Sequence, residues 1–170
     1  MGNFLLKGIE TKSFFIVHEH HAKMLHFDFR LAMDGVLKSW AMPKGPSMNP
    51  KEKRLAIMVV DHPLEYGSFE GVIPEGMYGA GTVIIWDKGR FKIKEGTLEM
   101  GRLTLILYGE KLKGVFSLIK MSGKNKGWLF IKKADEYADY TFKLKTVLKK
   151  KLKNLSNKDK SLHVIDKKSS

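Results

Sequence analysis

The segment 18–30 concentrates side chains that can bind metal ions and phosphate. Five of the six histidines of this 170-residue chain lie within its first 62 residues. From Leu25 to Leu31 apolar and polar residues alternate, which is the period of a half-buried β-strand. Residues two apart on a strand share a face, so His26, Asp28 and Arg30 should point to one side. An imidazole, a carboxylate and a guanidinium would then stand in one row opposite an apolar face.

Two imidazoles and one carboxylate can form a three-ligand set for a divalent transition metal. His26 and Asp28 supply two of these ligands. A third would come from an upstream histidine bent back onto the same face: His18, His20 or His21. The set is compatible with Mn²⁺, Fe²⁺ or Zn²⁺ and leaves positions open for water or substrate. Because Arg30 adds a planar fork suited to phosphate or carboxylate, the pattern predicts a phosphoester site.

Two other functions are compatible with the same residues. His26-x-Asp28 with a distant His62 imitates the two-His-one-carboxylate site of a non-haem iron oxygenase. Alternatively, the histidine cluster is structural and the chain is a non-catalytic, metal-stabilised module that binds nucleic acid. A single histidine on a strand is most simply a polar residue on its wet face. The number of histidines and the His-x-Asp-x-Arg spacing favour a functional site.

The charge of the chain predicts a polyanionic partner. Its formal net charge is +13, and residues 141–170 alone hold ten Lys and two Asp. A protein that neutralises phosphates releases the counterions condensed around them, which favours binding to nucleic acid. Charge by itself does not distinguish DNA from RNA.

The composition also excludes several classes of site. There are no cysteines, so disulfides, thiolate metal sites and a cysteine nucleophile are excluded. The first residues lack the features of a signal peptide, and no segment approaches the roughly 18 consecutive apolar residues of a membrane span. We therefore expect a soluble cytoplasmic monomer that does not bind membranes.

Many short strands at regular spacing predict a mainly β fold, a compact antiparallel β-barrel with a few peripheral helices. The expected strands cover residues 14–17, 25–33, 36–42, 54–60, 82–86, 90–93, 103–108, 115–120 and 128–132. Tight turns at 33–35 and 87–89 would join two hairpins. The Gly-, Tyr- and Pro-rich stretch 64–81 should be a loop that carries function.

The C-terminal part predicts the one long helix of the chain. Apolar residues lie near helical spacing between Ala138 and Leu155, among many lysines. We expect residues 1–140 to form a single domain. Residues 141–170 would be a Lys-rich basic helix or tail that packs on this domain or trails from it.

Several long motifs, matching in order, resemble a known family. They include His-His-Ala-x-x-Leu-His-Phe-Asp-Phe-Arg-Leu at 20–31, Asp-His-Pro-Leu-Glu-Tyr-Gly at 61–67 and Phe-Glu-Gly-Val-Ile-Pro-Glu-Gly-Met-Tyr-Gly-Ala-Gly-Thr-Val at 69–83. The stretch 33–47 and the strand 128–132 match as well. Together these motifs resemble the 3′-phosphoesterase domain of bacterial DNA ligase D and its stand-alone bacterial and archaeal relatives.

The resemblance implies a manganese-dependent enzyme that heals the 3′ end of a primer strand on a template. Zn²⁺ or Co²⁺ could replace Mn²⁺. Phosphodiester cleavage would remove a 3′-terminal ribonucleoside and leave a 3′-phosphate, and a phosphomonoesterase step would then leave a 3′-hydroxyl. The enzyme would serve DNA repair by non-homologous end joining, in association with the nucleoid. A separately encoded ligase, polymerase or end-binding protein would be its partner.

The resemblance also implies roles for individual residues. The metal ligands would be His20, His26 and Asp28. Arg30 and His62 would clamp the phosphate, with His62 as proton donor to the leaving oxygen. Tyr66 matches a family tyrosine with a role in the monoesterase step. Lys44 and Arg54 match basic positions near the site. His18 stands at a supporting polar position, which is glutamine in many relatives.

One departure concerns the N-terminal arm. Ligase-linked members place an additional arginine from this arm on the phosphate, whereas here no arginine precedes Arg30. Only Lys7 and Lys12 are available in the arm, and lysine lacks the planar fork. We therefore expect either that the phosphate is held less specifically or that the monoesterase step is weak.

Overall fold

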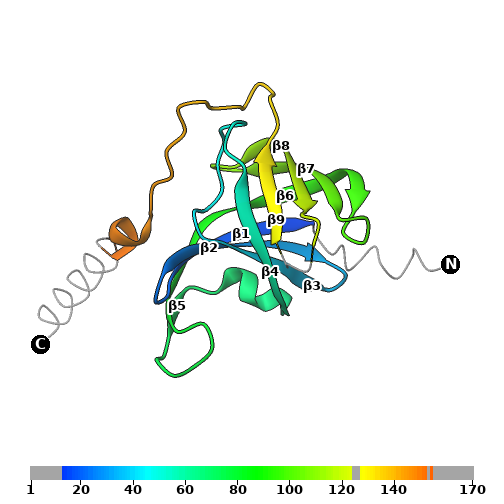
Figure 1. The fold of residues 1–170 in the computed structure, drawn as a ribbon. Helices are drawn as coiled ribbons and strands as arrows, with labels where there is room; N and C mark the ends of the chain where they lie inside the picture. Colours follow the sequence, from blue (N-terminus) through cyan, green and yellow to red (C-terminus); the bar gives the residue numbers. More distant parts are fainter. Residues whose placement is uncertain (1–12, 124–126, 153, 155–170) are drawn as a thin grey trace, which may run out of the picture.

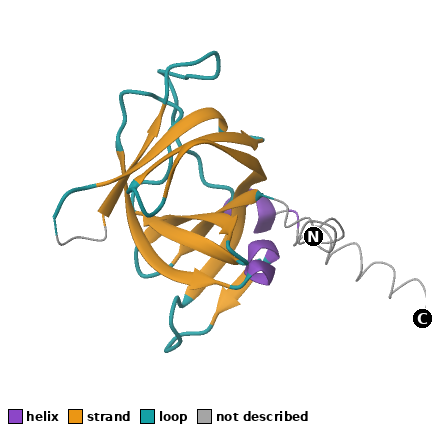
Figure 2. Cartoon of the chain, turned by 90° about the vertical axis from the view of Figure 1, so that its right-hand side faces the viewer, coloured by secondary structure: helices purple, strands orange, loops and turns teal. Residues whose placement is uncertain are grey.

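The computed structural model describes residues 13–123, 127–152 and 154. The described strands are β1 Phe14–His21, β2 Leu25–Met33, β3 Val36–Met42, β4 Arg54–His62, β5 Gly71–Ile73, β6 Gly81–Thr97, β7 Arg102–Gly109, β8 Lys113–Lys120 and β9 Gly127–Lys132. They form one antiparallel sheet in the order β1-β2-β3-β4-β9-β8-β7-β6-β5, which pairing between β1 and β6 closes. The predicted barrel is confirmed (Figures 1 and 2), with β5 added at the edge of β6.

Alternation along the strands places the aromatic residues inside the barrel. Phe27, Phe29 and Leu31 of β2 are buried, as the spacing predicts. The ring centroid of Phe130 on β9 lies 4.9 Å from the ring centroid of Phe29 and 4.7 Å from that of Phe116. Each such side chain contributes about 1.5–3 kcal/mol when fully buried. The even-numbered residues of β2 must therefore point away from the core.

Before the C-terminal segment, the structure differs from the prediction in three places. The stretch 64–81, expected to be a loop, contains β5 and a short 3₁₀ helix. The first strand was expected to end at Val17, but β1 continues to His21 and pairs with β2 over its whole length. The turn expected at 87–89 is absent, because β6 runs unbroken through it from Gly81 to Thr97. The side chain of Asp87 is buried there and accepts hydrogen bonds from three backbone N–H groups of the β7–β8 connection. Long-range backbone contacts of this kind override the local turn signal of Asp-Lys-Gly.

The predicted helix from Ala138 to Leu155 is wrong for most of its length. Residues 138–147 are not helical, and within the described residues the C-terminal helix covers only 148–152 and 154. Leu144 and Val147 pack instead against the core as an extended strap, and the indole N–H of Trp86 donates to the carbonyl of Lys145 at 2.7 Å. The tail beyond this helix lies outside the described residues.

The strap ends on the strand that carries the histidines. The buried carboxylate of Glu19 accepts the backbone N–H groups of Val147 and Leu148 at 2.8 and 3.0 Å, so it caps the helix that follows. A short 3₁₀ helix, η1 Leu64–Ser68, follows β4. In the described part of the chain, no helix has the length and apolarity that crossing a membrane requires.

Candidate metal and phosphate site

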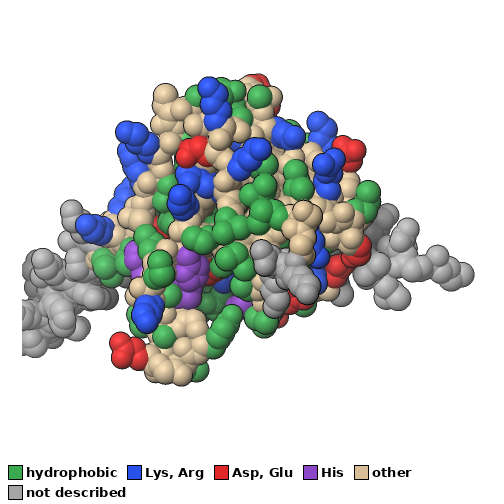
Figure 3. Space-filling view, viewed as in Figure 1, with side chains coloured by type: hydrophobic (Ala, Val, Ile, Leu, Met, Phe, Trp, Pro, Cys, Tyr) green, Lys and Arg blue, Asp and Glu red, His purple; other side chains and the backbone are tan. Residues whose placement is uncertain are grey.

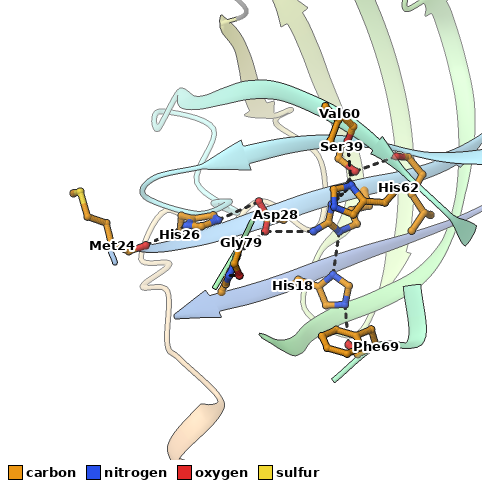
Figure 4. Close-up of polar contacts among 12 residues, drawn as sticks. His18, Met24, His26, Asp28, Ser39, Val60, His62, Phe69 and Gly79 are labelled. Carbon is orange, nitrogen blue, oxygen red and sulfur yellow. Dashed lines mark hydrogen bonds and ion pairs between the residues drawn. The ribbon is translucent and has the colours of Figure 1, made fainter. Parts of the chain in front are cut away.

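The register of β1 and β2 brings the candidate ligands together. His20 stands opposite His26 across the antiparallel pair, and His18 stands opposite Asp28. Potential ligand atoms of His20, His26 and Asp28 lie within 4.8 Å of one another. The close-up in Figure 4 shows Asp28 between the ring of His26 and the group that includes Ser39 and His62. A straight β1 thus supplies the third imidazole, which the sequence suggested would require a bend.

Apart from their contacts with Asp28, the two rings each use one nitrogen, so the nitrogen that faces Asp28 is available to a cation. His20 Nε2 lies 2.7 Å from the carbonyl oxygen of Gly79, and His26 Nδ1 lies 3.1 Å from that of Met24. A carbonyl only accepts, so these nitrogens carry the protons of the neutral rings. The remaining nitrogens then aim lone pairs at Asp28, each 3.3 Å from a carboxylate oxygen. Converging acceptors fit a divalent metal held by outer hydrogen bonds.

The protonation of the cluster agrees with a site built for a cation. Burial alone would raise the pKa of Asp28, but contacts with His20, His26 and Arg30 together lower it, so its carboxylate is ionised. Hydrogen bonding to Asp28 raises the pKa of His26 against the opposing effect of burial. The contact with Asp28 thus favours a proton on His26, and a metal would have to compete with that proton for this ring.

Arg30 is held rigidly beside this cluster. Its side chain is 3% exposed, with Nη2 3.4 Å from Asp28. Nε donates to His18 Nδ1 at 3.0 Å and Nη1 donates to Ser39 Oγ at 2.9 Å. Burial and the charge of Arg30 lower the pKa of His18 to about 4. His18 is thus a neutral acceptor that orients the guanidinium, with Nε2–H donating to Phe69.

His62 and Tyr66 complete the surroundings of the guanidinium. His62 Nδ1 lies 3.2 Å from Arg30 Nη1 and 3.0 Å from the carbonyl oxygen of Val60. This nitrogen can accept from the arginine or donate to the carbonyl, so the two contacts alternate with the tautomer. Burial, followed by the charge of Arg30, lowers the pKa of His62, and the ring is neutral at pH 7. The guanidinium carbon lies 5.0 Å from the centroid of the Tyr66 ring.

These side chains open into a cavity of about 510 Å³. Its polar lining includes His20, His26, Asp28, Arg30 and His62, together with Lys23. The connection between β5 and β6 also lines the cavity, through Tyr78, Gly79 and Ala80. In Figure 3 the histidines form a patch bordered by hydrophobic side chains. The predicted functional loop at 64–81 therefore does face the site.

The loop reaches His20 because its backbone adopts conformations that favour glycine. Gly79, whose carbonyl receives the His20 proton, has φ +75°. Gly81 has φ +129°, and a Cβ there would collide with the backbone carbonyl of His21. Side chains at these positions would push the loop away from the metal-ligand candidates.

The other sequence candidates lie in different surroundings. His62 is grouped with Arg30 and not with His26 and Asp28, so the ligand set expected of an iron oxygenase does not form among the described residues. Lys44 and Arg54 do not line the cavity, and Arg54 instead pairs with Glu52 at 2.8 Å. Lys7 and Lys12 lie outside the described residues.

Sequence reasoning missed two contributors to the site. Ser39 stands opposite Arg30 in the β2–β3 register, and strand alternation along β3 could have identified it as facing the same side. The carbonyl of Gly79 acts through the backbone, and no residue type marks such a contribution. Only the folded loop shows that it lies against His20.

Comparison with known proteins identifies relatives across most of the chain. The sequence profile of the DNA Ligase D 3′-phosphoesterase domain matches residues 18–120. The multifunctional non-homologous end joining protein LigD of Pseudomonas aeruginosa is 51% identical over 127 residues, 71% of this chain. The corresponding proteins of Mycobacterium tuberculosis and Mycolicibacterium smegmatis are 46% and 41% identical over 68% and 72% of the chain. These matches cover only 15–17% of the relatives' own lengths.

Proposed function

The chain belongs to the family of DNA ligase D 3′-phosphoesterase domains, and from this premise we propose that it is a metal-dependent enzyme that heals DNA 3′ ends. It removes a 3′-terminal ribonucleoside by phosphodiester cleavage and then removes the 3′-phosphate, leaving a 3′-hydroxyl. The observation that carries the proposal is the row of side chains on β1 and β2. Two imidazole lone pairs and a carboxylate converge beside a buried, fully oriented guanidinium.

His20, His26 and Asp28 hold the metal, for which we propose Mn²⁺, with Zn²⁺ or Co²⁺ as substitutes. When bound, such an ion polarises a phosphate oxygen and lowers the pKa of a coordinated water. The hydrogen bonds from His20 to Gly79 and from His26 to Met24 fix which ring nitrogen faces the ion. They also keep both rings in their orientation before substrate arrives.

Arg30 and His62 hold the scissile phosphate. The guanidinium already has its geometry fixed by His18, Ser39 and Asp28, so it needs little reorganisation to stabilise charge on the equatorial oxygens. When His62 Nδ1 accepts from Arg30, its Nε2–H is free to donate to the phosphate or to the leaving oxygen. Because the ring is neutral before substrate binds, it becomes a proton donor to the leaving oxygen only after the negatively charged phosphodiester raises its pKa.

In the diesterase step the bond between phosphorus and the 5′-oxygen of the terminal nucleoside breaks, and a water oxygen bonds to phosphorus. The leaving oxygen takes a proton and the primer keeps a 3′-phosphate. Tyr66, whose ring lies against both Arg30 and His62, positions these two groups for the monoesterase step. Lys44 and Arg54 bind nucleic acid outside the cavity.

The substrate is a primer–template whose primer carries a 3′-ribonucleotide or a 3′-phosphate. The domain 1–140, whose described strands form the barrel, carries the chemistry, and the Lys-rich segment 141–170 adds electrostatic affinity for DNA. The enzyme acts in the cytoplasm at the nucleoid as a monomer. A separately encoded ligase, polymerase or end-binding protein uses the ends that it has healed.

The test uses 5′-labelled primer–templates whose primers end in one or two ribonucleotides. The protein is incubated with Mn²⁺, and the product ends are resolved on a gel, with chelator and His26→Ala as controls. We expect a shortened strand with a 3′-phosphate that is later converted to a 3′-hydroxyl. The absence of metal-dependent cleavage would contradict the proposal.

Two rival functions predict different results in the same preparation. A metal-stabilised binding module would bind the primer–template without cleaving it, and His26→Ala would lower its melting temperature. An iron oxygenase would consume 2-oxoglutarate with Fe²⁺, whereas the phosphoesterase is insensitive to 2-oxoglutarate. Accumulation of 3′-phosphate alone would show that lysine does not replace the arginine of the N-terminal arm.

A further inference from the structure

The cavity has an apolar side that the metal and phosphate chemistry does not use. Besides the polar row, the lining includes Ile73 of β5, Tyr78 and Ala80 of the β5–β6 connection, and Ala22. Tyr78 leaves 80% of its surface exposed, so its ring is not part of the packing of the barrel. Exposed aromatic side chains at the edge of a cavity are typical of ligand contacts.

The backbone around Tyr78 is fixed relative to the polar row. The carbonyl of the next residue, Gly79, accepts from His20 at 2.7 Å. The N–H of Ala80 donates to the carbonyl of Met77 at 3.1 Å, and that of Met77 donates to Pro74 at 3.3 Å. The loop thus ties the backbone beside Tyr78 directly to a metal-ligand candidate. The backbone of Tyr78 is therefore held beside the polar row, and its side chain lines the same cavity.

The size and chemistry of the cavity match a nucleoside attached to a phosphate. Its volume of about 510 Å³ falls within the roughly 300–1,000 Å³ of pockets that bind small ligands. The phosphate side needs only the guanidinium, the imidazoles and the carboxylate. The remaining apolar lining has no complementary group in a phosphate or a sugar, whereas a nucleobase offers a flat π-face.

We propose that Tyr78 and the apolar side of this cavity form a nucleobase subsite that holds the terminal nucleoside of the 3′ end by stacking. The identity of the ligand rests on the proposed end-healing function. Stacking is tolerant of sequence because every base has a π-face, so the subsite accepts any of the four bases. The subsite serves the diesterase step alone, because a strand that ends in a 3′-phosphate has no nucleoside beyond the phosphate.

Binding of a ribonucleoside 5′-monophosphate tests the subsite independently of catalysis. Adenosine 5′-monophosphate contains the terminal nucleoside with its 5′-phosphate, and ribose 5-phosphate is the same ligand without the base. Both are titrated by calorimetry into the Mn²⁺-loaded protein and into Tyr78→Ala, Tyr78→Phe and Tyr108→Ala. Tyr108, 49% exposed on β7, is the matched control for loss of an exposed tyrosine outside the cavity.

We expect the base to strengthen binding about five- to 100-fold in the unaltered protein, in Tyr78→Phe and in Tyr108→Ala. In Tyr78→Ala the two ligands should bind with similar affinity. The subsite is contradicted if the base gives no advantage in the unaltered protein, or if Tyr78→Ala keeps the advantage. It is also contradicted if Tyr78→Ala weakens both ligands equally, since the residue would then act through the phosphate site.

Kinetics separate a failure of the subsite from a failure of the proposed function. With primers ending in two ribonucleotides, Tyr78→Ala should raise KM for ribonucleoside removal, while hydrolysis of a 3′-phosphate changes less than about twofold. An equal loss in both reactions would overturn the subsite and leave the end-healing function intact. Base-dependent binding without any cleavage would overturn the function and leave the subsite intact.

Discussion

Two buried carboxylates on neighbouring parts of the barrel have opposite kinds of partner. Asp28 on β2 is 5% exposed and contacts only side chains: His20, His26 and Arg30. Asp87 on β6 is 3% exposed and accepts three backbone N–H groups, from Glu110, Lys111 and Leu112 at 2.8–3.2 Å. Burial is nearly equal, so it does not tell a functional carboxylate from a structural one.

Asp28 and Asp87 differ in whether a metal ion can take the place of a hydrogen-bond partner. Backbone donors are fixed by the fold, so the oxygens of Asp87 are permanently satisfied and cannot accept a metal. The imidazoles around Asp28 aim lone pairs at it from the edge of a cavity and form good contacts only through a proton or a cation. Glu19 combines both kinds of partner, because it accepts two backbone N–H groups of the C-terminal segment and also lies 2.8 Å from His21 Nε2.

The largest expected effect comes from removing His26, a metal-ligand candidate beside Asp28. His26→Ala should lower affinity for Mn²⁺ by at least about 100-fold, more than the loss of an outer hydrogen-bond partner. Phosphate release should fall below detection. Mn²⁺ at 100 times its Kd for the unaltered protein should stabilise that protein by about 2.7 kcal/mol and the variant by no more than about 0.4 kcal/mol, as measured by thermal melting. Full metal stabilisation of His26→Ala would show that the site lies elsewhere.

A second test separates metal binding from phosphate binding. Arg30→Lys keeps the charge beside Asp28 and loses the planar fork. We expect kcat/KM to fall about 100-fold, the usual effect of losing one fixed donor to the transition state. Calorimetry should show Mn²⁺ affinity within threefold of that of the unaltered protein. A parallel loss of metal affinity would instead make Arg30 part of the support of the ligands.

Substitution of Asp87, the carboxylate that accepts backbone N–H groups, should lower stability and leave metal binding and catalysis unchanged. Asp87→Asn replaces one acceptor oxygen by an amide that cannot accept, which leaves a buried N–H without its partner. The free energy of unfolding should fall by about 1–3 kcal/mol in urea denaturation. Mn²⁺ affinity and the kinetics of the folded protein should stay unchanged. If catalysis fell more than stability, Asp87 would have a role that its contacts do not show.

The smallest expected effect concerns pH and a third carboxylate. Burial would raise the pKa of Asp135, but hydrogen bonds from Lys132, Val115 and Tyr137 lower it overall. Because the pKa of Asp135 is lower in the folded than in the unfolded protein, its ionised carboxylate stabilises the fold at pH values above the unfolded-state pKa. This stabilisation is lost as the pH falls through the folded-state pKa. Because the carboxyl is partly exposed, this contribution should not exceed about 1 kcal/mol.

The comparison of Asp135→Asn with the unaltered protein at pH 7 and at pH 3 measures this contribution. The unaltered protein should be the more stable at pH 7, and the difference should shrink at pH 3. If the difference in stability were the same at pH 7 and at pH 3, the charge of the Asp135 carboxylate would contribute nothing to stability.

The strands show where local pattern suffices. The alternation from Leu25 to Leu31 predicts which face of β2 is buried, because the apolar period of two is imposed by the pleat itself. The bounds of β2 and β3 agree with the prediction for the same reason. The prediction was wrong at 87–89 and at 138–147, where Asp87 and Lys145 engage distant parts of the chain. Turn and helix signals are weak compared with such contacts.

The sequence by itself determined the chemistry available to this protein: a row of His26, Asp28 and Arg30 on one strand face, the motifs of its family and a strongly basic charge. Only the tertiary structure decided that His20 stands opposite His26, that the carbonyl of Gly79 fixes its tautomer and that Tyr78 faces the same cavity. Residue types and strand period are local properties. Register between strands and the path of a loop depend on how distant segments pack, and no short-range pattern records that.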